Sequence, residues 1–364
     1  MAEHDQTQDV RVDGPGRPVV TLGRLRLLVQ LVMLFVTVYG GSLIGYYAAD
    51  KITGSLPALS CAYDKLDGAY CILIPTQHQL HHRVGEQIAQ AGTFALSMIV
   101  PLAFTFLTFY LFFVLLNKAF CGWVCPLGTV QELLYRLGRV LKRPFRGLSE
   151  AAARRLRPLK WTLLLILVMA LPLAAGLGVT PAVTGDAFCQ ICPSRLTTTL
   201  LTGDTDQLTI RQGGALEFAF GALANTLFGF VVIAALAARQ PFCRICPLLA
   251  LNAAFQRLSP MRLVKREHEK CEKCGICRQA CPMDIPEIHH EHGRKAFSED
   301  CTLCGRCAEY CPQDGVIQLK FGPLALFRSS REYYKARFKA EGTRGEVKAV
   351  RWFAGPVAQK GEDA

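Results

Sequence analysis

Sixteen cysteines in a chain of 364 residues are the side chains whose type and spacing favour chemistry. Eight of them form two copies of C-x2-C-x2-C-x3-C-P, written CEKCGICRQACP and CTLCGRCAEYCP. Thiolates at this spacing ligate the [4Fe–4S] cubanes of bacterial two-cluster ferredoxins, in which the fourth cysteine of each run ligates the other cluster. Structural zinc sites use two separated cysteine pairs instead. The pattern therefore predicts two [4Fe–4S] clusters.

Crossed ligation assigns each of these cysteines to one cluster. The first cluster is expected on Cys271, Cys274, Cys277 and Cys311. The second is expected on Cys301, Cys304, Cys307 and Cys281. Gly275 and Gly305 lie between the ligands, where glycine relieves a tight backbone.

The other eight cysteines form four pairs, and each pair follows a long apolar segment. The pairs are Cys61 and Cys71, Cys121 and Cys125, Cys189 and Cys192, and Cys243 and Cys246. In FCGWVCPLG, FCQICPSRL and FCRICPLLA the second cysteine precedes a proline, which is favoured at the first position of a helix. A cysteine at that point presents its sulfur to unpaired backbone N–H groups and the positive end of the helix dipole, which favours an anionic cluster.

The elements that must position these pairs are membrane spans. Hydrophobic residues make up 51% of the chain. Four windows without an ionised side chain are long enough to cross roughly 30 Å of hydrocarbon. They are Leu27–Ala49, Gly92–Leu116, Trp161–Thr180 and Phe218–Ala238. The expected fold is a membrane all-α bundle of four transmembrane helices over residues 25–260, followed by a small α+β two-[4Fe–4S] ferredoxin domain over residues 261–320.

The distribution of Lys and Arg predicts the orientation of the bundle. Residues 117–160, between the second and third spans, are strongly basic, and basic loops stay on the cytoplasmic side. The N-terminal tail 1–24, the ferredoxin domain and the basic C-terminal extension 321–364 are then cytoplasmic as well. We expect a multi-pass protein of the bacterial inner membrane. Most of the net charge of +12 flanks the spans, so no nucleic-acid partner is expected.

Because spans alternate in direction, the cysteine pairs should alternate between the two faces. Cys61, Cys71, Cys189 and Cys192 are expected outside, and Cys121, Cys125, Cys243 and Cys246 inside. Each face then has the ligands of one further [4Fe–4S] cluster, giving one or two such clusters at the membrane faces. The alternatives are disulfides outside and buried thiols inside.

The histidines bear on how electrons would cross the membrane. None lies within an expected span, so no haem is expected. Faces about 30 Å apart are too distant for one efficient electron hop, so either the clusters lie within the bundle or a quinone bridges them. His78, His81 and His82 in PTQHQLHHRVGEQ are candidate acceptors of a quinol proton. The alternative is that they are surface histidines on an interfacial segment.

The spans, CGWVCPLG at Cys121–Gly128 and the C-terminal two-cluster run together resemble the polyferredoxin quinol dehydrogenases. These are the NapH-type membrane subunits of periplasmic nitrate reduction and the C-terminal half of the NosR-type proteins of nitrous oxide respiration. The resemblance covers roughly residues 24–318. The later Cys-Pro pairs depart from it, since they are C-x2-C where the family usually has C-x3-C.

The resemblance implies an oxidoreductase component that passes electrons between the quinone pool or a cytoplasmic donor and an extracytoplasmic redox partner. The expected partners are membrane lipid, an extracytoplasmic redox protein, and a cytoplasmic ferredoxin-like donor or a quinol. A first alternative is a metal- or cofactor-reducing assembly factor. A second, from another class, is a transmembrane thiol–disulfide relay.

Overall fold

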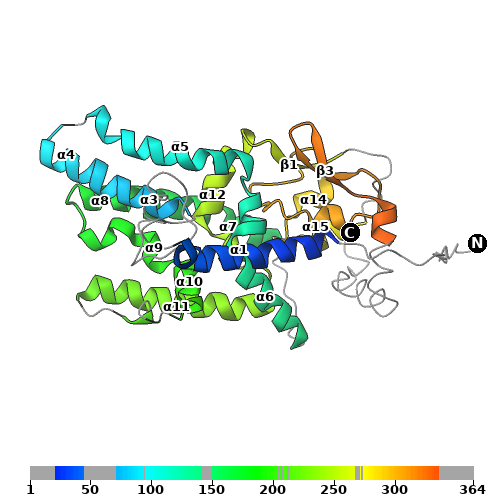
Figure 1. Ribbon diagram of the computed structural model, residues 1–364, viewed down its shortest axis with the longest axis horizontal. Coiled ribbons are helices and arrows are strands. Elements are labelled where there is room, and N and C mark those ends of the chain that lie inside the picture. Colours follow the sequence, from blue (N-terminus) through cyan, green and yellow to red (C-terminus); the bar gives the residue numbers. More distant parts are fainter. Residues whose placement is uncertain are drawn as a thin grey trace, which may run out of the picture.

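The computed structural model describes residues 21–44, 71–93, 95–141, 150–203, 205, 208–210, 213–266, 271 and 274–335. Helices lie along the long axis of the molecule, and a small domain with a β-sheet forms one end (Figure 1). The tips of α4 (Glu86–Ala91) and α8 (Leu171–Gly176) lie at the other end, on the left in Figure 1. Cys61 lies outside the described residues.

The longest helical runs each contain a long apolar stretch. They are α1 (Leu22–Ile44), the continuous run of α7 (Glu150–Leu163), the π-helix η4 (Leu164–Ala170) and α8 (Leu171–Gly176), and α11 (Ala215–Ala237). Within the described ranges, three segments are long and apolar enough to cross a membrane: Leu22–Tyr39, Ala151–Gly176 and Ala215–Ala237. These correspond to the first, third and fourth predicted spans.

The second predicted span, Gly92–Leu116, has a different form. It contains a 3-10 turn, η2 (Leu96–Met98), and then α5 (Val100–Leu115), which has 16 residues. A helix of that length rises about 24 Å, less than the hydrocarbon core of a typical bilayer. The four-span prediction is therefore supported at three of its four positions.

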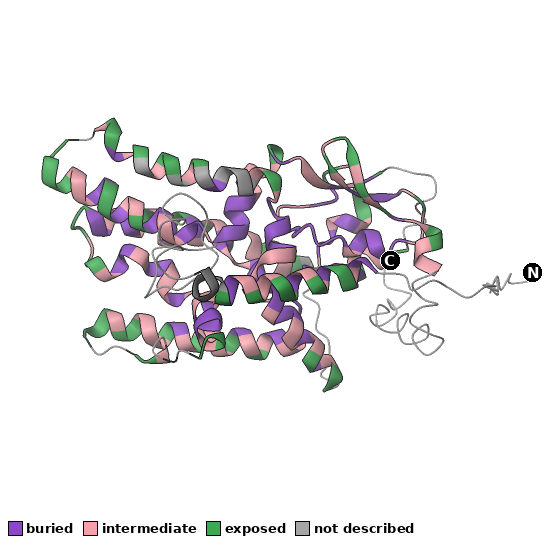
Figure 2. Ribbon diagram, viewed as in Figure 1, coloured by how far each residue is buried: buried purple, intermediate pink, exposed green. Residues whose placement is uncertain are grey.

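The outer sides of the long helices are exposed and apolar. Only 17% of the apolar window in α11 is buried, and Phe218, Phe230 and Ile233 are exposed on it. Figure 2 shows the same exposure along the outer sides of α1, α5 and α11, with buried residues where the elements meet. Contact with lipid tails explains these surfaces, because water would oppose so large an apolar exposure.

Short helices follow the cysteine motifs and turn back into the bundle. They are α6 (Pro126–Val140), α10 (Pro193–Leu201) and α12 (Pro247–Ala254). Each begins at the predicted proline, and Cys125, Cys192 and Cys246 occupy the N-cap positions. The connecting turns and helices are η3 (Phe120–Val124), η5 (Ala182–Asp186), α9 (Ala187–Ile191), η7 (Phe242–Arg244) and η8 (Phe255–Arg257).

A continuous helical rod follows Cys71. It consists of α3 (Leu73–His78), the π-helix η1 (Gln79–Gly85) and α4 (Glu86–Ala91). At the end of η1 the N–H group of Glu86 donates to the carbonyl oxygen of His81, an i to i+5 bond. An added Cβ atom at Gly85 would overlap the backbone of Gly176, so η1 lies directly against the end of α8.

The C-terminal domain has the expected α+β composition. Its antiparallel sheet has the order β1 (Met261–Lys265), β2 (Ile317–Phe321) and β3 (Leu324–Arg328). The helices are α13 (Ile276–Ala280), α14 (Glu287–His290) and α15 (Arg306–Glu309). Strand β3 lies beyond residue 320, the expected end of the domain, and pairs Phe327 with Leu319 of β2. Tyr333 accepts a hydrogen bond from the N–H of Leu22 at 2.6 Å, and residues beyond 335 lie outside the described ranges.

Ion pairs attach this domain to the bundle. Arg157 of α7 contacts Glu287 and Asp300, each at 2.6 Å. Arg244 of η7 contacts Asp284, also at 2.6 Å. The ferredoxin domain therefore packs against the end of the bundle that carries Arg157 and Arg244.

A buried carboxylate joins three parts of the chain at this boundary. Glu132 of α6 lies 3.2 Å from Arg26 of α1 and 3.2 Å from Arg306 of α15. Burial opposes ionisation of Glu132, but Arg306, Arg26 and Arg136 outweigh it and lower its pKa to about 2. Glu132 is therefore ionised at neutral pH and holds the ferredoxin domain to α1 and α6.

Candidate metal centres

The four cysteines assigned to the first ferredoxin cluster line one cavity. They are Cys271, Cys274, Cys277 and Cys311. Gly275 has a φ of +75° at the start of α13, a conformation that side chains disfavour, and it turns the chain between Cys274 and Cys277. The structure therefore brings together the ligand set that crossed ligation predicts.

The cysteines assigned to the second ferredoxin cluster are buried together. Burial, and after it the neighbouring sulfurs of Cys304 and Cys301, raise the pKa of Cys307, and burial raises the pKa of Cys301 to about 11. At neutral pH, thiols with such raised pKa values stay protonated unless a metal cation binds the sulfur in place of the proton. Four buried sulfurs fit a metal cluster, because iron would supply the missing positive charge.

The remaining cysteines meet inside the bundle. One cavity is lined by Cys71, Cys125, Cys189, Cys192 and Cys246. The sequence placed Cys71, Cys189 and Cys192 on one face and Cys125 and Cys246 on the other, roughly 30 Å away. The shared cavity agrees with the first of the two possibilities left open by the sequence, in which the cluster ligands lie within the bundle. Helices α6 and α10 pack against α11 and each other, and α12 packs against α7 and η4, which carries the N-cap cysteines into the interior.

Backbone donors surround these N-cap sulfurs as the proline pattern predicts. The N–H groups of Gly128 and Leu127 donate to Cys125, and those of Ser194 and Arg195 donate to Cys192. These are the unpaired donors of a helical first turn, and they favour negative charge on the sulfur.

Cys121 and Cys243 are buried beside this cavity. Burial, and after it the sulfurs of Cys192, Cys243, Cys121 and Cys125, raise the pKa of Cys246. The Nδ2 group of Asn252 donates to Cys121 Sγ at 3.5 Å. Two four-cysteine sets are therefore neighbours, with Cys61 of the outer set outside the described residues. Their donor type and burial fit two cubanes, as in the ferredoxin domain.

Two buried glutamines contact Cys189 and Cys243 in the same way. Gln77 donates from Nε2 to Cys189 Sγ at 2.9 Å and accepts from the N–H of Phe188 at 3.2 Å. Gln131 donates to Cys243 Sγ at 3.6 Å and accepts from the N–H of Phe242 at 3.1 Å. Both side chains are fully buried.

The sequence contains a repeat that could have identified these two glutamines, beyond the Cys-Pro motifs themselves. Cys71 and Cys125, Gln77 and Gln131, and Cys189 and Cys243 are each 54 residues apart. The segments CILIPTQ and CPLGTVQ therefore align, and each places its glutamine six residues after a cysteine. The repeat extends beyond the Cys-Pro motifs to residues that contact the sulfurs.

The inner cysteines lie close to the ferredoxin domain. The indole N–H of Trp123 donates to the carbonyl oxygen of Leu303 at 3.1 Å. An added Cβ atom at Gly122 would overlap the carbonyl oxygen of Thr302, so the loop after Cys121 touches the loop between Cys301 and Cys304. The cysteine sets consequently form a row from the ferredoxin domain into the bundle.

A buried cation lies at this junction. Lys118 Nζ donates to the carbonyl oxygen of Ser298 at 3.1 Å and to Gln256 Oε1 at 2.8 Å. Its ammonium group is close enough to Cys301 and Cys121 to affect the charge of both. Burial lowers the pKa of Lys118, and negative charge at Cys301 and Cys121 opposes that shift, so anionic clusters there would favour its charged form.

The described residues also bear on the disulfide alternative and on the candidate quinol-site histidines. Among the described residues, the cysteines are thiols rather than disulfides. His81 and His82 of η1 lie against Glu86, and they do not line the cavity of the membrane cysteines. The ring of His78 packs edge-on against that of His82, 5.9 Å between centroids.

Comparison with known proteins agrees with these assignments. A model described as a 4Fe-4S binding domain matches residues 95–144 and 220–266, and one described as a 4Fe-4S dicluster domain matches residues 263–318. The chain is 30% identical to the regulatory protein NosR of Pseudomonas aeruginosa, over 52% of this chain and 23% of NosR. It is 27% identical to YccM of Escherichia coli, named for electron transport, over 79% of this chain and 74% of YccM.

A third relative is the ferredoxin-type protein NapH of Haemophilus influenzae, 27% identical over 50% of this chain and 53% of NapH. The chain thus spans about half of NapH and a quarter of NosR. No solved structure matches. These motifs, matched domains and relatives support placing the chain with the NapH/NosR-type polyferredoxins.

Proposed function

We propose that the chain conducts electrons across the bacterial inner membrane through four [4Fe–4S] clusters. The quinone pool or a cytoplasmic donor is the proposed partner at one end, and an extracytoplasmic redox protein is the proposed partner at the other. The observation that carries this proposal is the shared cavity of Cys125 and Cys246 with Cys71, Cys189 and Cys192. Cysteines from both expected faces lie around one space, so electron transfer between the two sets needs no separate bridging carrier.

The proposed ligands follow the sets described above. Two clusters belong to the ferredoxin domain. The inner membrane cluster takes Cys121, Cys125, Cys243 and Cys246, and the outer one takes Cys61, Cys71, Cys189 and Cys192. Clusters of this kind change by one electron without a proton transfer. The protein's own contribution is to bury the thiolates, to donate hydrogen bonds to them and to exclude water from the cavity.

The packing of the ferredoxin domain against the helical bundle supports electron entry or exit at the ferredoxin domain. Trp123, Gly122 and Lys118 attach the loop of the inner cysteines to the loop of Cys301 and Cys304. Because these contacts are buried, the second ferredoxin cluster and the inner membrane cluster would be held at a fixed separation. Efficient transfer needs such a fixed arrangement.

Iron and sulfide analysis of anaerobically purified protein tests the proposal. Four cubanes predict about sixteen irons and as many sulfides per chain, whereas the ferredoxin domain alone predicts about eight. Cys125→Ser and Cys189→Ser should each remove about four irons and leave the others in place. A preparation that holds about eight irons in both wild type and variants would contradict the proposal.

A thiol–disulfide relay gives a different result in the same preparation. It predicts the lower iron content together with alkylation of Cys189, Cys192, Cys243 and Cys246 only after reduction. Magnetic coupling between the reduced membrane clusters in electron paramagnetic resonance provides a second readout. Spectra that are simple sums of isolated clusters would contradict the close approach of the two sets.

A further inference from the structure

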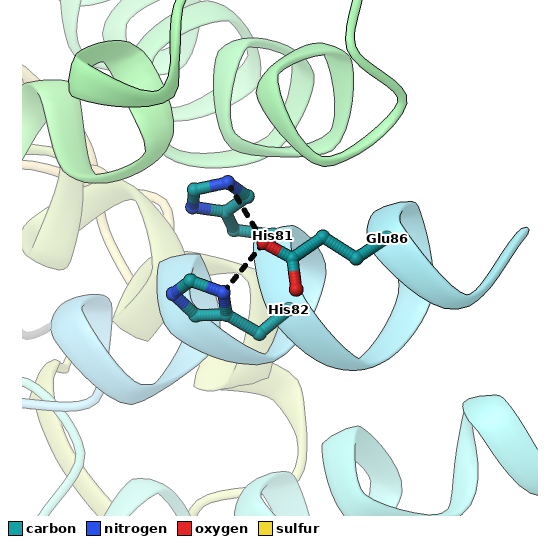
Figure 3. Close-up of side chains that lie close together, drawn as sticks. All are labelled: His81, His82 and Glu86. Carbon is teal, nitrogen blue, oxygen red and sulfur yellow. Dashed lines mark hydrogen bonds and ion pairs between the residues drawn. The ribbon is translucent and has the colours of Figure 1, made fainter. Parts of the chain in front are cut away.

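Figure 3 shows a cluster of side chains on the helical rod after Cys71, away from the cysteines. The Nδ1 atom of His82 lies 2.9 Å from Glu86 Oε1, and the Nε2 atom of His81 lies 3.6 Å from the same oxygen. The two imidazole rings stack with centroids 4.1 Å apart. One ligand atom from each of the three residues lies within 4.8 Å of the others.

The π-helical turn creates this arrangement. In an α-helix the side chains at i and i+4 share a face, which suits His82 and Glu86 but turns His81 away. The i to i+5 bond from the N–H of Glu86 to the carbonyl oxygen of His81 widens the turn and brings residues five apart onto one face. Turns of this kind are rare and are often found at functional sites.

The position of His81 is fixed by its neighbours. The residue is 7% exposed, and an added Cβ atom at Gly185 would overlap its ring. The buried His81 side chain is therefore held in place against η5. By contrast, His82 and Glu86 are partly exposed, which leaves a path for an ion from solvent.

We propose that His81, His82 and Glu86 bind a divalent transition-metal ion of the zinc or ferrous class. Two imidazoles and one carboxylate form a common three-ligand set for such ions, with at least one position open. Ligands at about 2.0–2.1 Å in tetrahedral geometry are roughly 3.3 Å apart. The observed separations of 2.9 and 3.6 Å lie on either side of that value, so small side-chain movements suffice.

This role excludes proton transfer from a quinol at the same residues, because the metal would occupy the imidazole lone pairs. The geometry favours the metal. Both rings are directed at one carboxylate oxygen, and His81 and His82 stack on each other with no space for a quinone ring between them. The inference does not depend on the proposed electron path, since none of the three residues is a candidate cluster ligand.

Zinc binding to the full-length protein tests the inference. Cluster-loaded protein is dialysed against buffered Zn²⁺, and bound zinc is measured together with iron. We expect about one zinc per chain, with nitrogen and oxygen ligands at about 2.0–2.1 Å in X-ray absorption. His82→Ala and Glu86→Gln should weaken zinc binding roughly 100-fold while the iron content stays unchanged.

His290→Ala is the matched control, because His290 lies beside His289 in the ferredoxin domain as His82 lies beside His81. It should bind zinc as the wild type does. The inference is overturned if no zinc binds, if both variants bind as tightly as the wild type, or if the absorption spectrum shows sulfur at about 2.3 Å. An iron content of the wild-type protein well below about sixteen per chain would count against the proposed function and not against the zinc site.

Discussion

Gln77 donates from its side-chain amide to Cys189 Sγ at 2.9 Å, although the two residues are 112 positions apart in the chain. The amide oxygen of Gln77 accepts from the N–H of Phe188, so the same side chain also fixes the backbone beside the sulfur. Hydrogen bonds to cluster sulfurs stabilise the reduced state, which carries more negative charge. Gln77 is therefore placed to position Cys189 and to raise the potential of a cluster there.

Gln77→Leu should lower the midpoint potential of the cluster proposed on Cys189. Loss of one N–H to sulfur bond is worth about 1 kcal/mol, or roughly 50 mV for one electron. A redox titration followed by electron paramagnetic resonance measures the shift. Gln90→Leu, at an exposed position of the same helical rod, should leave every potential unchanged. Equal potentials in Gln77→Leu and wild type would rule out this role for Gln77.

Lys118→Met should lower the potentials of the clusters proposed on Cys301 and Cys121. Reduction adds negative charge, and the buried ammonium group favours it, so removal of the cation makes reduction harder by roughly 30–100 mV. The same titration reports both clusters. Lys320→Met, on β2, removes an equal charge at a half-buried position and should have a much smaller effect. A larger shift in that control would show that the effect of Lys118 is not local.

Glu132→Gln should destabilise the docked protein by about 3 kcal/mol at neutral pH, because Arg26 and Arg306 then lose their buried partner. The folded pKa of Glu132, about 2, lies below the unfolded value of about 4.3. The stabilisation is therefore fully present above pH about 4.3 and is lost as the pH falls toward 2. Thermal unfolding of wild type and variant should differ by a constant amount between pH 8 and 5.

The difference between wild type and Glu132→Gln should begin to shrink below pH about 4.5. Glu332→Gln, at an exposed position, serves as the control and should unfold as the wild type does. Identical unfolding of Glu132→Gln and wild type at pH 7 would mean that the buried ion network does not hold the two parts together.

Gly122→Ala should loosen the ferredoxin domain from the bundle. The added methyl group meets the carbonyl oxygen of Thr302 and the backbone of Cys304, and neither can move without displacing the loop. Overpacking of this kind costs about 1–3 kcal/mol. Faster protease cleavage between the two parts would report it. Gly229→Ala in α11 has open space around it and should be cleaved as slowly as the wild type.

Local sequence patterns determined the parts of the protein whose chemistry depends on nearby residues. The two ferredoxin runs identified Cys271, Cys274, Cys277 and Cys311 as one set, because the spacing of a short loop fixes where its sulfurs can lie. The prolines after Cys125, Cys192 and Cys246 correctly predicted helix starts, since proline restricts its own backbone. Apolar length identified three of the described helices as long enough to cross a membrane.

Only the tertiary structure decided how these parts meet. Hydropathy gives the length of a span but not the path of the chain after it, so the return of α6, α10 and α12 into the bundle was not predicted. That return brings Cys125 beside Cys192 and lets Gln77 reach Cys189, contacts between residues far apart in sequence. The contact between the side chains of His81 and Glu86 depends on a π-helical turn, because a regular α-helix would place the two side chains on different faces.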